Sequence, residues 1–197
     1  MNADTIAEAY QAIRSEVGPT VTVVAATKYV PPHEMVVLAE AGIEVVGENR
    51  VQEMQRKHEL HGDRFRWHFI GALQSNKARI VDSICELVHA VDTDSAARRL
   101  TIPALLEVNL SGEASKSGVE EAEIEGFLER HPSICGLMTM PPFSESPETS
   151  RPTFRRLAEL ARQHGLAQLS MGTSQDWRVG VEEGATLIRV GSTLFRT

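Results

Sequence analysis

The chain has 197 residues, of which 42% are apolar, and its 20 basic against 27 acidic side chains give a formal net charge of −7. This length lets one domain bury a full hydrophobic core without disulfide or metal cross-links, so we expect a single domain over residues 1–197. The acidic balance argues against nucleic acid as a partner, because no broad basic surface is available to neutralise phosphate groups.

The N-terminal segment and the number of cysteines indicate the cellular compartment in which we expect the protein. Asp4, Glu8 and Arg14 interrupt the first apolar stretch, which leaves no hydrophobic segment for a secretory signal. The longest apolar runs are too short to span a membrane. Cys85 and Cys135 are too few for a disulfide framework and lack metal-ligand spacing. We therefore expect a soluble, cytoplasmic protein.

The first predicted element is an amphipathic helix, in which Ile6, Tyr10, Ile13 and Val17 fall on one stripe. We expect this extra N-terminal helix to pack against the base or side of the main fold and to have a structural role.

Apolar, β-rich runs then recur along the chain, separated by stretches with helical spacing of apolar residues. The eight runs cover residues 21–27, 43–49, 65–71, 86–92, 103–110, 134–142, 167–174 and 185–191. Short strands that alternate with helices specify βα units with parallel, fully buried strands. Eight such units close an α/β fold of the (β/α)8 TIM barrel type.

The alternative is an open, doubly wound sheet, which often has a Gly-rich turn directly after its first strand. Residues 27–32 contain no glycine, so we favour the barrel. A TIM barrel usually needs about 250 residues, with about 200 as a lower limit, so this one must be minimal. The tightest connection is 93–102, where we expect a short or partial helix capped by Asp94.

The loosest stretch covers residues 141–152 and contains mainly Pro, Ser and charged residues. It follows the sixth strand at the end of the barrel where active sites lie. Two interpretations stay open, a mobile rim loop over the site or an ordinary solvated connection.

The last two predicted strands both end in glycine with hydroxyl residues, at 170–174 and 191–193. TIM-barrel phosphate sites are frequently built from these two loops. Glycine lets the backbone approach the anion, N–H groups at a helix start point toward it, and hydroxyls add donors. These loops therefore predict a phosphate site.

Lys28 ends the first predicted strand. A lysine at a strand end is usually a solvated charge, but a partly desolvated one can form a Schiff base with an aldehyde. An aldehyde that bears a phosphate, and that reaches from the last two strands to the first, describes pyridoxal 5′-phosphate (PLP). A sugar-phosphate aldehyde is the competing ligand.

Arg189 lies two residues before Gly191 and deeper in the last strand. It can form a salt bridge with an interior acid such as Glu48 or Glu107. If the ligand is PLP, an arginine at the ring nitrogen donates a hydrogen bond and keeps that nitrogen unprotonated, which weakens the ring as an electron sink.

A set of sequence blocks is similar to a known family. The blocks are Ala25–Lys28, Gly47–Glu53, Trp67–Lys77, Ser115–Gly118, Gly136–Met138, Ser170–Asp176 and Arg189–Ser192. In this order they resemble the YggS/PROSC family of PLP homeostasis proteins, which look like the N-terminal barrel of alanine racemase standing alone.

The resemblance implies that Lys28 forms the Schiff base with PLP, that Asn49 lies beside the ring and that Arg189 faces the ring nitrogen. It implies that the phosphate is surrounded by Ser170, Ser174, Gly191 and Ser192. It also implies a role in storing and delivering PLP, with PLP-dependent apoenzymes as transient recipients.

A racemase of this fold type needs a second base opposite the lysine. Tyr10 belongs to the N-terminal helix, and Tyr29 adjoins Lys28, so its side chain is expected to point away. His68 is the remaining candidate, either as a neighbour of the ring or as a hydrogen-bonded core histidine. We therefore expect a monomeric PLP-binding protein without robust enzymatic activity. A weak PLP-dependent racemase or decarboxylase and a Schiff-base aldolase remain alternatives.

No metal is expected. His58 and His61 lack the spacing and the third ligand of a zinc site.

Overall fold

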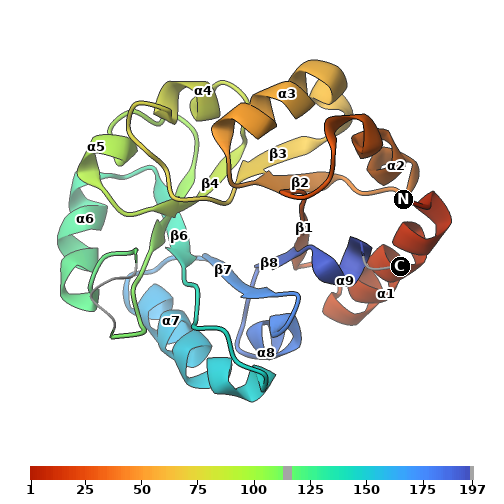
Figure 1. Cartoon of the computed structure of the whole chain (residues 1–197). Helices are drawn as coiled ribbons and strands as arrows, with labels where there is room; N and C mark the ends of the chain where they lie inside the picture. The colour runs from red at the N-terminus through yellow and green to blue at the C-terminus, as the bar shows by residue number, and fades with distance from the viewer. Residues whose placement is uncertain (113–116, 196–197) are drawn as a thin grey trace.

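Eight parallel strands close a barrel in chain order in the computed structural model, which describes residues 1–112 and 117–195 (Figure 1). The strands are β1 (Thr22–Ala26), β2 (Val45–Glu48), β3 (Arg66–Phe69), β4 (Leu87–Val91), β5 (Ala104–Glu107), β6 (Ile134–Met138), β7 (Gln168–Thr173) and β8 (Leu187–Val190). Each lies within one of the predicted runs, so the predicted barrel is confirmed. The barrel closes where β1 pairs with β8, with Val24 opposite Arg189 and Ala25 opposite Val190.

Helices surround the ring of strands (Figure 1). They are α1 (Ala3–Val17), α2 (Met35–Glu40), α3 (Val51–His61), α4 (Ala78–Asp82), α5 (Asp94–Ala97), α6 (Ile124–Arg130), α7 (Arg151–Gln163), α8 (Trp177–Glu182) and α9 (Ser192–Phe195). Single turns of 3-10 helix are η1 (Pro32–Glu34), η2 (Gly62–Arg64), η3 (Glu121–Glu123) and η4 (Pro147–Ser150).

The N-terminal helix buries the predicted stripe. Ile6, Tyr10, Ile13 and Val17 are the buried residues of α1, and they pack beside α2 and α9. The helix therefore covers the side of the barrel next to the β1–β8 seam.

The connection between β4 and β5 holds only the four-residue helix α5, as expected for the tightest link. The predicted capping role of Asp94 is wrong, because Thr93 occupies the N-cap position and Asp94 is the first helical residue. The Asp94 carboxylate instead accepts hydrogen bonds from Arg130 Nε (3.0 Å) and His131 Nε2 (2.5 Å). Asp94 thus ties α5 to the end of α6.

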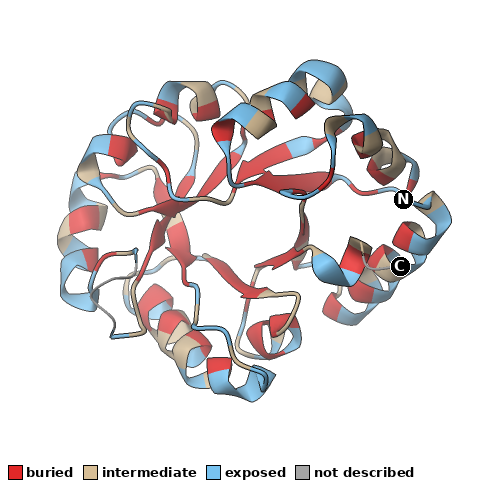
Figure 2. Ribbon diagram, in the orientation of Figure 1, coloured by how far each residue is buried: buried red, intermediate tan, exposed pale blue. Residues whose placement is uncertain are grey.

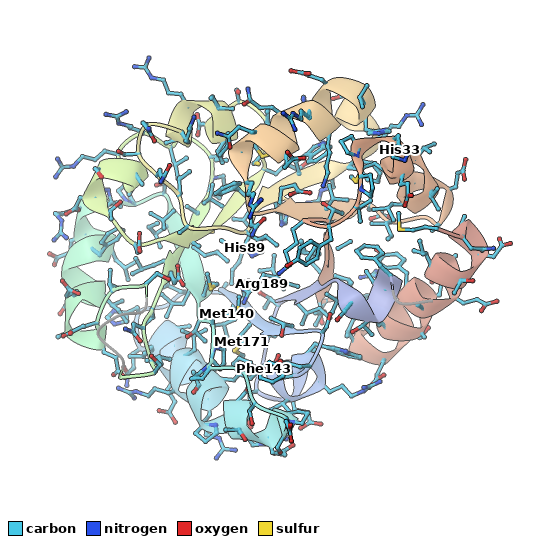
Figure 3. All side chains as sticks on the ribbon, in the orientation of Figure 1. His33, His89, Met140, Phe143, Met171 and Arg189 are labelled. Carbon is cyan, nitrogen blue, oxygen red and sulfur yellow. The ribbon has the colours of Figure 1, made fainter. Side chains whose placement is uncertain are left out.

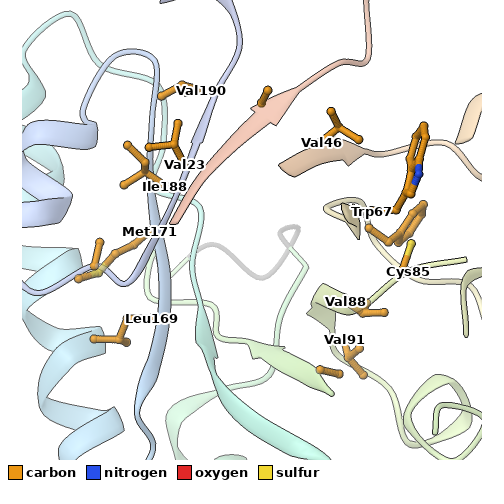
Figure 4. Close-up of a cluster of buried hydrophobic side chains, with 14 of the residues drawn as sticks. Val23, Val46, Trp67, Cys85, Val88, Val91, Leu169, Met171, Ile188 and Val190 are labelled. Carbon is orange, nitrogen blue, oxygen red and sulfur yellow. The ribbon is translucent and has the colours of Figure 1, made fainter. Parts of the chain in front are cut away.

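The hydrophobic core has two parts, one outside and one inside the ring of strands. The outer part fills the space between strands and helices, and Figure 4 shows some of its members, including Trp67, Met171 and Ile188. In Figure 2 most strand residues are buried, and the helices are buried mainly on the side that faces the strands. The inner part consists of Val24, Val45, Leu87, Ala90, Leu105, Met138 and Leu187.

A polar layer follows the inner apolar one toward the C-terminal ends of the strands. Residues two apart in a strand face the same side. Inward-facing Leu87, Leu105 and Leu187 are therefore followed on the same face by polar residues at positions 89, 107 and 189, all buried. This alternation places a layer of buried polar side chains inside the barrel, just below its C-terminal mouth.

The stretch predicted as the loosest, 141–152, is only partly irregular. Its second half forms η4 and the start of α7, while Phe143 in its first half is 81% exposed. Among the residues that the structure describes, no helix is both long and apolar enough to cross a membrane.

Candidate functional site

The loops that follow β7 and β8 join directly at the mouth of the barrel. Ser174 Oγ accepts hydrogen bonds from the backbone N–H groups of Gly191 (3.0 Å) and Thr193 (3.3 Å). Thr193 Oγ1 donates in return to the Ser174 carbonyl oxygen (3.2 Å). The predicted residues Ser174 and Gly191 are therefore brought together, with the exposed Ser192 between Gly191 and Thr193.

A buried carboxylate fixes the shape of the first of these loops. Asp176 accepts hydrogen bonds from the Thr173 backbone N–H (2.7 Å), the Thr173 hydroxyl (3.0 Å) and the Ser150 hydroxyl (2.7 Å). Gly172 adopts φ +94°, and a Cβ there would lie 2.8 Å from the Cα of Trp177. The loop therefore needs glycine at 172 and an acceptor at 176, a requirement that the sequence analysis did not identify.

Lys28 lies in a turn directly after β1, beside this junction because β1 pairs with β8. Its side chain is exposed, and Nζ is 5.1 Å from the centroid of the Tyr29 ring. The expectation that Tyr29 points away from Lys28 is therefore wrong. Alternation of side chains applies within a strand, but β1 ends at Ala26, before both residues.

The turn that carries Lys28 rests on a buried ion pair. Lys57 of α3 and Glu48 of β2 form a salt bridge, with 1% and 0% of their side chains exposed. Lys57 Nζ also donates to the Thr27 carbonyl oxygen (2.8 Å), and the Thr27 hydroxyl donates to Glu48 (2.6 Å). The pair thus holds the residue before Lys28 through both its backbone and its side chain.

Asn49 follows β2 at the mouth and is exposed. Its backbone approaches the end of β3 so closely that a Cβ at Gly71 would lie 2.5 Å from the Asn49 carbonyl oxygen. Glycine at position 71 is therefore necessary for the position of Asn49 next to β3.

Arg189 and Ser170 meet inside the barrel rather than at the loop junction. Arg189 donates through one terminal nitrogen to the Ser170 hydroxyl and carbonyl (3.0 Å to the latter), and through the other to the Thr139 carbonyl (3.2 Å). Ser170 is completely buried. The predicted phosphate contact of Ser170 stays a prediction, since here its hydroxyl is engaged below the mouth.

The guanidinium of Arg189 is buried, and this burial lowers its pKa to about 10, so that it keeps its charge at neutral pH. The salt bridge considered for it does not form with Glu48, which pairs with Lys57. In the described part of the chain, no carboxylate lies within salt-bridge distance of Arg189, although the negative charge of Glu107 partly offsets the desolvation.

Two histidines extend the interior hydrogen bonds to the other side of the barrel. His89 Nδ1 lies 2.8 Å from Ser170 Oγ, and His89 Nε2 lies 3.0 Å from His68 Nδ1. Burial lowers the pKa of His68 to about 4 and that of His89 well below its usual range. His68 is therefore a buried, hydrogen-bonded histidine, and its position as a neighbour of a PLP ring stays a prediction. His89 was missed, although a polar residue two positions after an inward-facing leucine is a signal for it.

A cavity of about 410 Å³ opens at the mouth on the side of β3 to β6. Ile70, Met138, Met140 and Phe143 give it apolar walls, and Glu107 supplies its charge. Burial raises the pKa of Glu107, whose carboxylate accepts a hydrogen bond from Ser117 (2.9 Å).

Residues 115–116 of the quoted sequence blocks lie outside the described residues. Among those described, no cluster of three His, Cys, Asp or Glu residues has the arrangement of a metal site.

Known proteins share this sequence and this barrel. The family model "Alanine racemase, N-terminal domain" matches residues 1–197. A pyridoxal phosphate homeostasis protein of Aquifex aeolicus is 40% identical over 191 residues, which cover 86% of this chain and 84% of that protein. Another from Vibrio alginolyticus is 36% identical over 200 residues, which cover 89% of this chain and 86% of that protein. The chain belongs to the pyridoxal phosphate homeostasis protein family.

Solved structures similar to this family member include PipY from Synechococcus elongatus, which is 34% identical. The TM-score is 0.87 for PipY without PLP and 0.84 for PipY with PLP bound, over 96% of this chain and 99% of PipY. Lysine/ornithine decarboxylase from Vibrio vulnificus is 15% identical, with a TM-score of 0.72 over 98% of this chain and 62% of the enzyme. That likeness shows a shared fold alone.

Proposed function

We propose that this chain binds PLP and acts as a cytoplasmic carrier, which stores the cofactor and delivers it to PLP-dependent apoenzymes. Its relatives are named pyridoxal phosphate homeostasis proteins, and PipY has been solved with PLP bound. The observation that carries the proposal is the β1–β8 seam, which puts the turn of Lys28 next to the junction of Ser174 and Gly191.

The donors at the mouth fit a phosphate. Two backbone N–H groups, from Gly191 and Thr193, already converge on one oxygen atom, Ser174 Oγ. Converging N–H groups and hydroxyls are the donor set that phosphate oxygens accept from. Rotation of the Ser174 side chain would free both N–H groups and add its own hydroxyl as a donor.

The remaining predicted residues fit the rest of the cofactor. When bound, PLP supplies an aldehyde and an electron-withdrawing pyridine ring. The exposed amine of Lys28 would hold the aldehyde carbon, and Asn49 would lie beside the ring. Arg189 would donate to the ring nitrogen and keep it unprotonated, while Ser192 would join Ser174 and Gly191 at the phosphate. The bonds of Ser170 favour a role in holding Arg189.

We propose that the carrier has no robust activity of its own, because Tyr29 and His68, the described residues considered as a second base, are not held free across the mouth from Lys28. Tyr29 lies against Lys28 itself and is 87% exposed. His68 is 3% exposed, and its Nδ1 is bound to His89. A stereochemical turnover assay with amino acids checks this, and racemisation that is lost in His68→Ala would make the protein an enzyme.

Borohydride reduction of the PLP-loaded protein tests the proposal. We expect a single pyridoxyl group on Lys28, found by peptide mass mapping, and none in Lys28→Ala. Lys57 is a matched internal control, since it is close in the fold but buried in an ion pair. Label on another lysine with Lys28 unmodified would overturn the assignment. Labelling by a sugar-phosphate aldehyde but not by PLP would instead support an aldolase.

A further inference from the structure

A continuous hydrogen-bonded chain crosses the inside of the barrel below the mouth. It runs from Arg189 on β8 through Ser170 on β7 and His89 on β4 to His68 on β3. The exposed fractions of these four residues are 4%, 0%, 0% and 3%. Figure 3 shows Arg189 and His89 near the centre of the ring of strands. Strands β4 and β7 are not neighbours, so this contact passes through the barrel interior.

Arg189 fixes which group donates and which accepts in each of these hydrogen bonds. A guanidinium only donates hydrogen bonds, so Ser170 Oγ must accept from Arg189. The single hydroxyl hydrogen of Ser170 then has one acceptor among the described residues, Nδ1 of His89. A neutral histidine that accepts at Nδ1 carries its proton on Nε2, which faces Nδ1 of His68 at 3.0 Å. His68 accepts this bond and therefore also carries its proton on Nε2.

The opposite direction leaves a buried donor without a partner. If His89 donated from Nδ1, Ser170 Oγ would accept two bonds, and its own hydrogen would have no acceptor among the described residues of a fully buried site. A buried unsatisfied donor is costly. Because burial keeps both imidazoles neutral at neutral pH, neither adds a positive charge next to the guanidinium.

The same bonds leave one donor of the guanidinium for a ligand. The terminal nitrogens of Arg189 are engaged by Ser170, by the Thr139 carbonyl and by the Met140 sulfur (3.8 Å). Its Nε–H has no acceptor within the described residues. Met140 also lines the cavity at the mouth, so one terminal nitrogen of Arg189 contacts a residue of the cavity wall.

We propose that Ser170, His89 and His68 form a positioning relay that holds the Arg189 guanidinium in one orientation, with both imidazoles protonated on Nε2. The relay leaves the Arg189 Nε–H group without a hydrogen-bond acceptor among the described residues. Its effect on a ring nitrogen rests on the proposed function, but the arrangement of protons is a property of the ligand-free protein.

Long-range ¹H–¹⁵N correlation spectra of ligand-free protein labelled at histidine test the proton arrangement. We expect Nε2-protonated tautomers for His68 and His89, assigned with His68→Gln and His89→Asn. In Ser170→Ala the bond that fixes the His89 tautomer is lost, and we expect a mixture of tautomers or a shift to the Nδ1–H form. An Nδ1–H tautomer of His89 in the wild-type protein would overturn the relay, whether or not PLP binds.

The absorption spectrum of bound PLP tests the effect on Arg189. We expect Ser170→Ala and His89→Asn to displace the visible band and to weaken PLP binding by about two- to tenfold, the range of one net hydrogen bond. Ser170→Thr, which keeps a hydroxyl, should restore the band. His131→Gln is the matched control, because His131 is equally buried but bonds Asp94 on the outside of the barrel.

The two readouts separate the two proposals. A wild-type protein that shows the expected tautomers but does not bind PLP would contradict the proposed function and leave the relay standing. A protein that binds PLP on Lys28, but whose band is unchanged in Ser170→Ala and His89→Asn, would contradict the positioning role.

Discussion

The Ser174 hydroxyl accepts hydrogen bonds from two backbone N–H groups of the neighbouring loop. A phosphate would compete with it for the same donors. We expect Ser174→Ala to cost about 1.5–3 kcal/mol of PLP binding, because a hydrogen bond to a charged acceptor is lost. Pyridoxal, which lacks the phosphate, should bind far more weakly and be nearly insensitive to the change. Equilibrium dialysis of both ligands at pH 7 measures this. Equal wild-type affinity for both would mean that these loops hold no phosphate.

Gly191 tests the same site through the backbone. A Cβ at this position would lie 3.1 Å from the Ala26 carbonyl oxygen, so a valine would press the loop against the end of β1. We expect Gly191→Val to weaken PLP binding much more than pyridoxal binding, in the same dialysis. Gly126→Ala is the control, since its tightest neighbour is the flexible end of Arg130. Similar losses for PLP and pyridoxal in Gly191→Val would point to a general distortion of the mouth.

His68 gives the stability of the fold a dependence on pH. Burial, with a smaller contribution from Arg66, lowers its pKa from 6.5 to about 4. The unfolded chain therefore takes up this proton at a higher pH than the folded protein. The contribution of neutral His68 to the free energy of unfolding is complete above pH 6.5, and it is lost as the pH falls from 6.5 to 4. This gap corresponds to roughly 3 kcal/mol.

Urea unfolding of wild-type protein and His68→Gln between pH 7 and pH 4 checks the size of this contribution. The wild-type protein should lose roughly 3 kcal/mol more of its unfolding free energy over this range than the variant. His33→Gln, at an exposed position, should behave like wild type. If the unfolding free energies of wild type and His68→Gln changed with pH in parallel, His68 would not be held neutral by the fold.

At the level of elements, the Glu48–Lys57 pair joins β2 and α3 to the turn after β1. Removal of one partner leaves a buried charge uncompensated, so we expect Lys57→Met to cost about 3–5 kcal/mol of unfolding free energy. The double variant Lys57→Met, Glu48→Gln should lose less, because it removes both charges. Chemical unfolding of the single and double variants measures both losses.

The exposed pair Arg66–Glu86 is the control for this experiment. Arg66→Ala should cost less than about 1 kcal/mol, since solvent screens exposed pairs. A Lys57→Met variant that is no less stable than Arg66→Ala would show that the buried pair does not hold the turn. Lys57→Met should also label more slowly in the borohydride experiment, because Thr27 is then released.

Strands were predictable because parallel strands buried on both faces appear as apolar runs, such as residues 21–27. The residues that begin and end the elements were harder to predict. Asp94 has the residue type of a cap, but the bonds to Arg130 and His131 engage its carboxylate instead. Lys57 has the sequence character of a solvated helix residue, and only the fold shows that it points at Glu48.

For the whole molecule, PLP binding should raise stability, since a ligand that binds only the folded state stabilises it by mass action. At a free concentration of 100 times Kd, the gain is about 2.7 kcal/mol. For a domain of this size, each kcal/mol shifts Tm by about 2–4 °C, so the removal of PLP should lower Tm by roughly 5–11 °C. Differential scanning calorimetry measures this shift. Lys28→Ala should show a much smaller one.

The meeting of the loops with Ser174 and Gly191 was predictable, because each loop is one short segment with a recognisable pattern. The row of interior hydrogen bonds was not predictable, because it joins residues far apart in sequence, and His89 and Ser170 are 81 positions apart. In the sequence each is only a polar residue in an apolar run. Their pairing depends on which strands face each other across the barrel, and this is decided only when the barrel closes.

The seam between β1 and β8 has a consequence for biosynthesis. Lys28 is made well before the loop of Gly191, although the two lie on paired strands in the folded barrel. A nascent chain therefore displays the amine without the groups that would select its aldehyde by the phosphate. If Lys28 holds the aldehyde as proposed, we expect selective loading only once both strands of this seam have been made and paired.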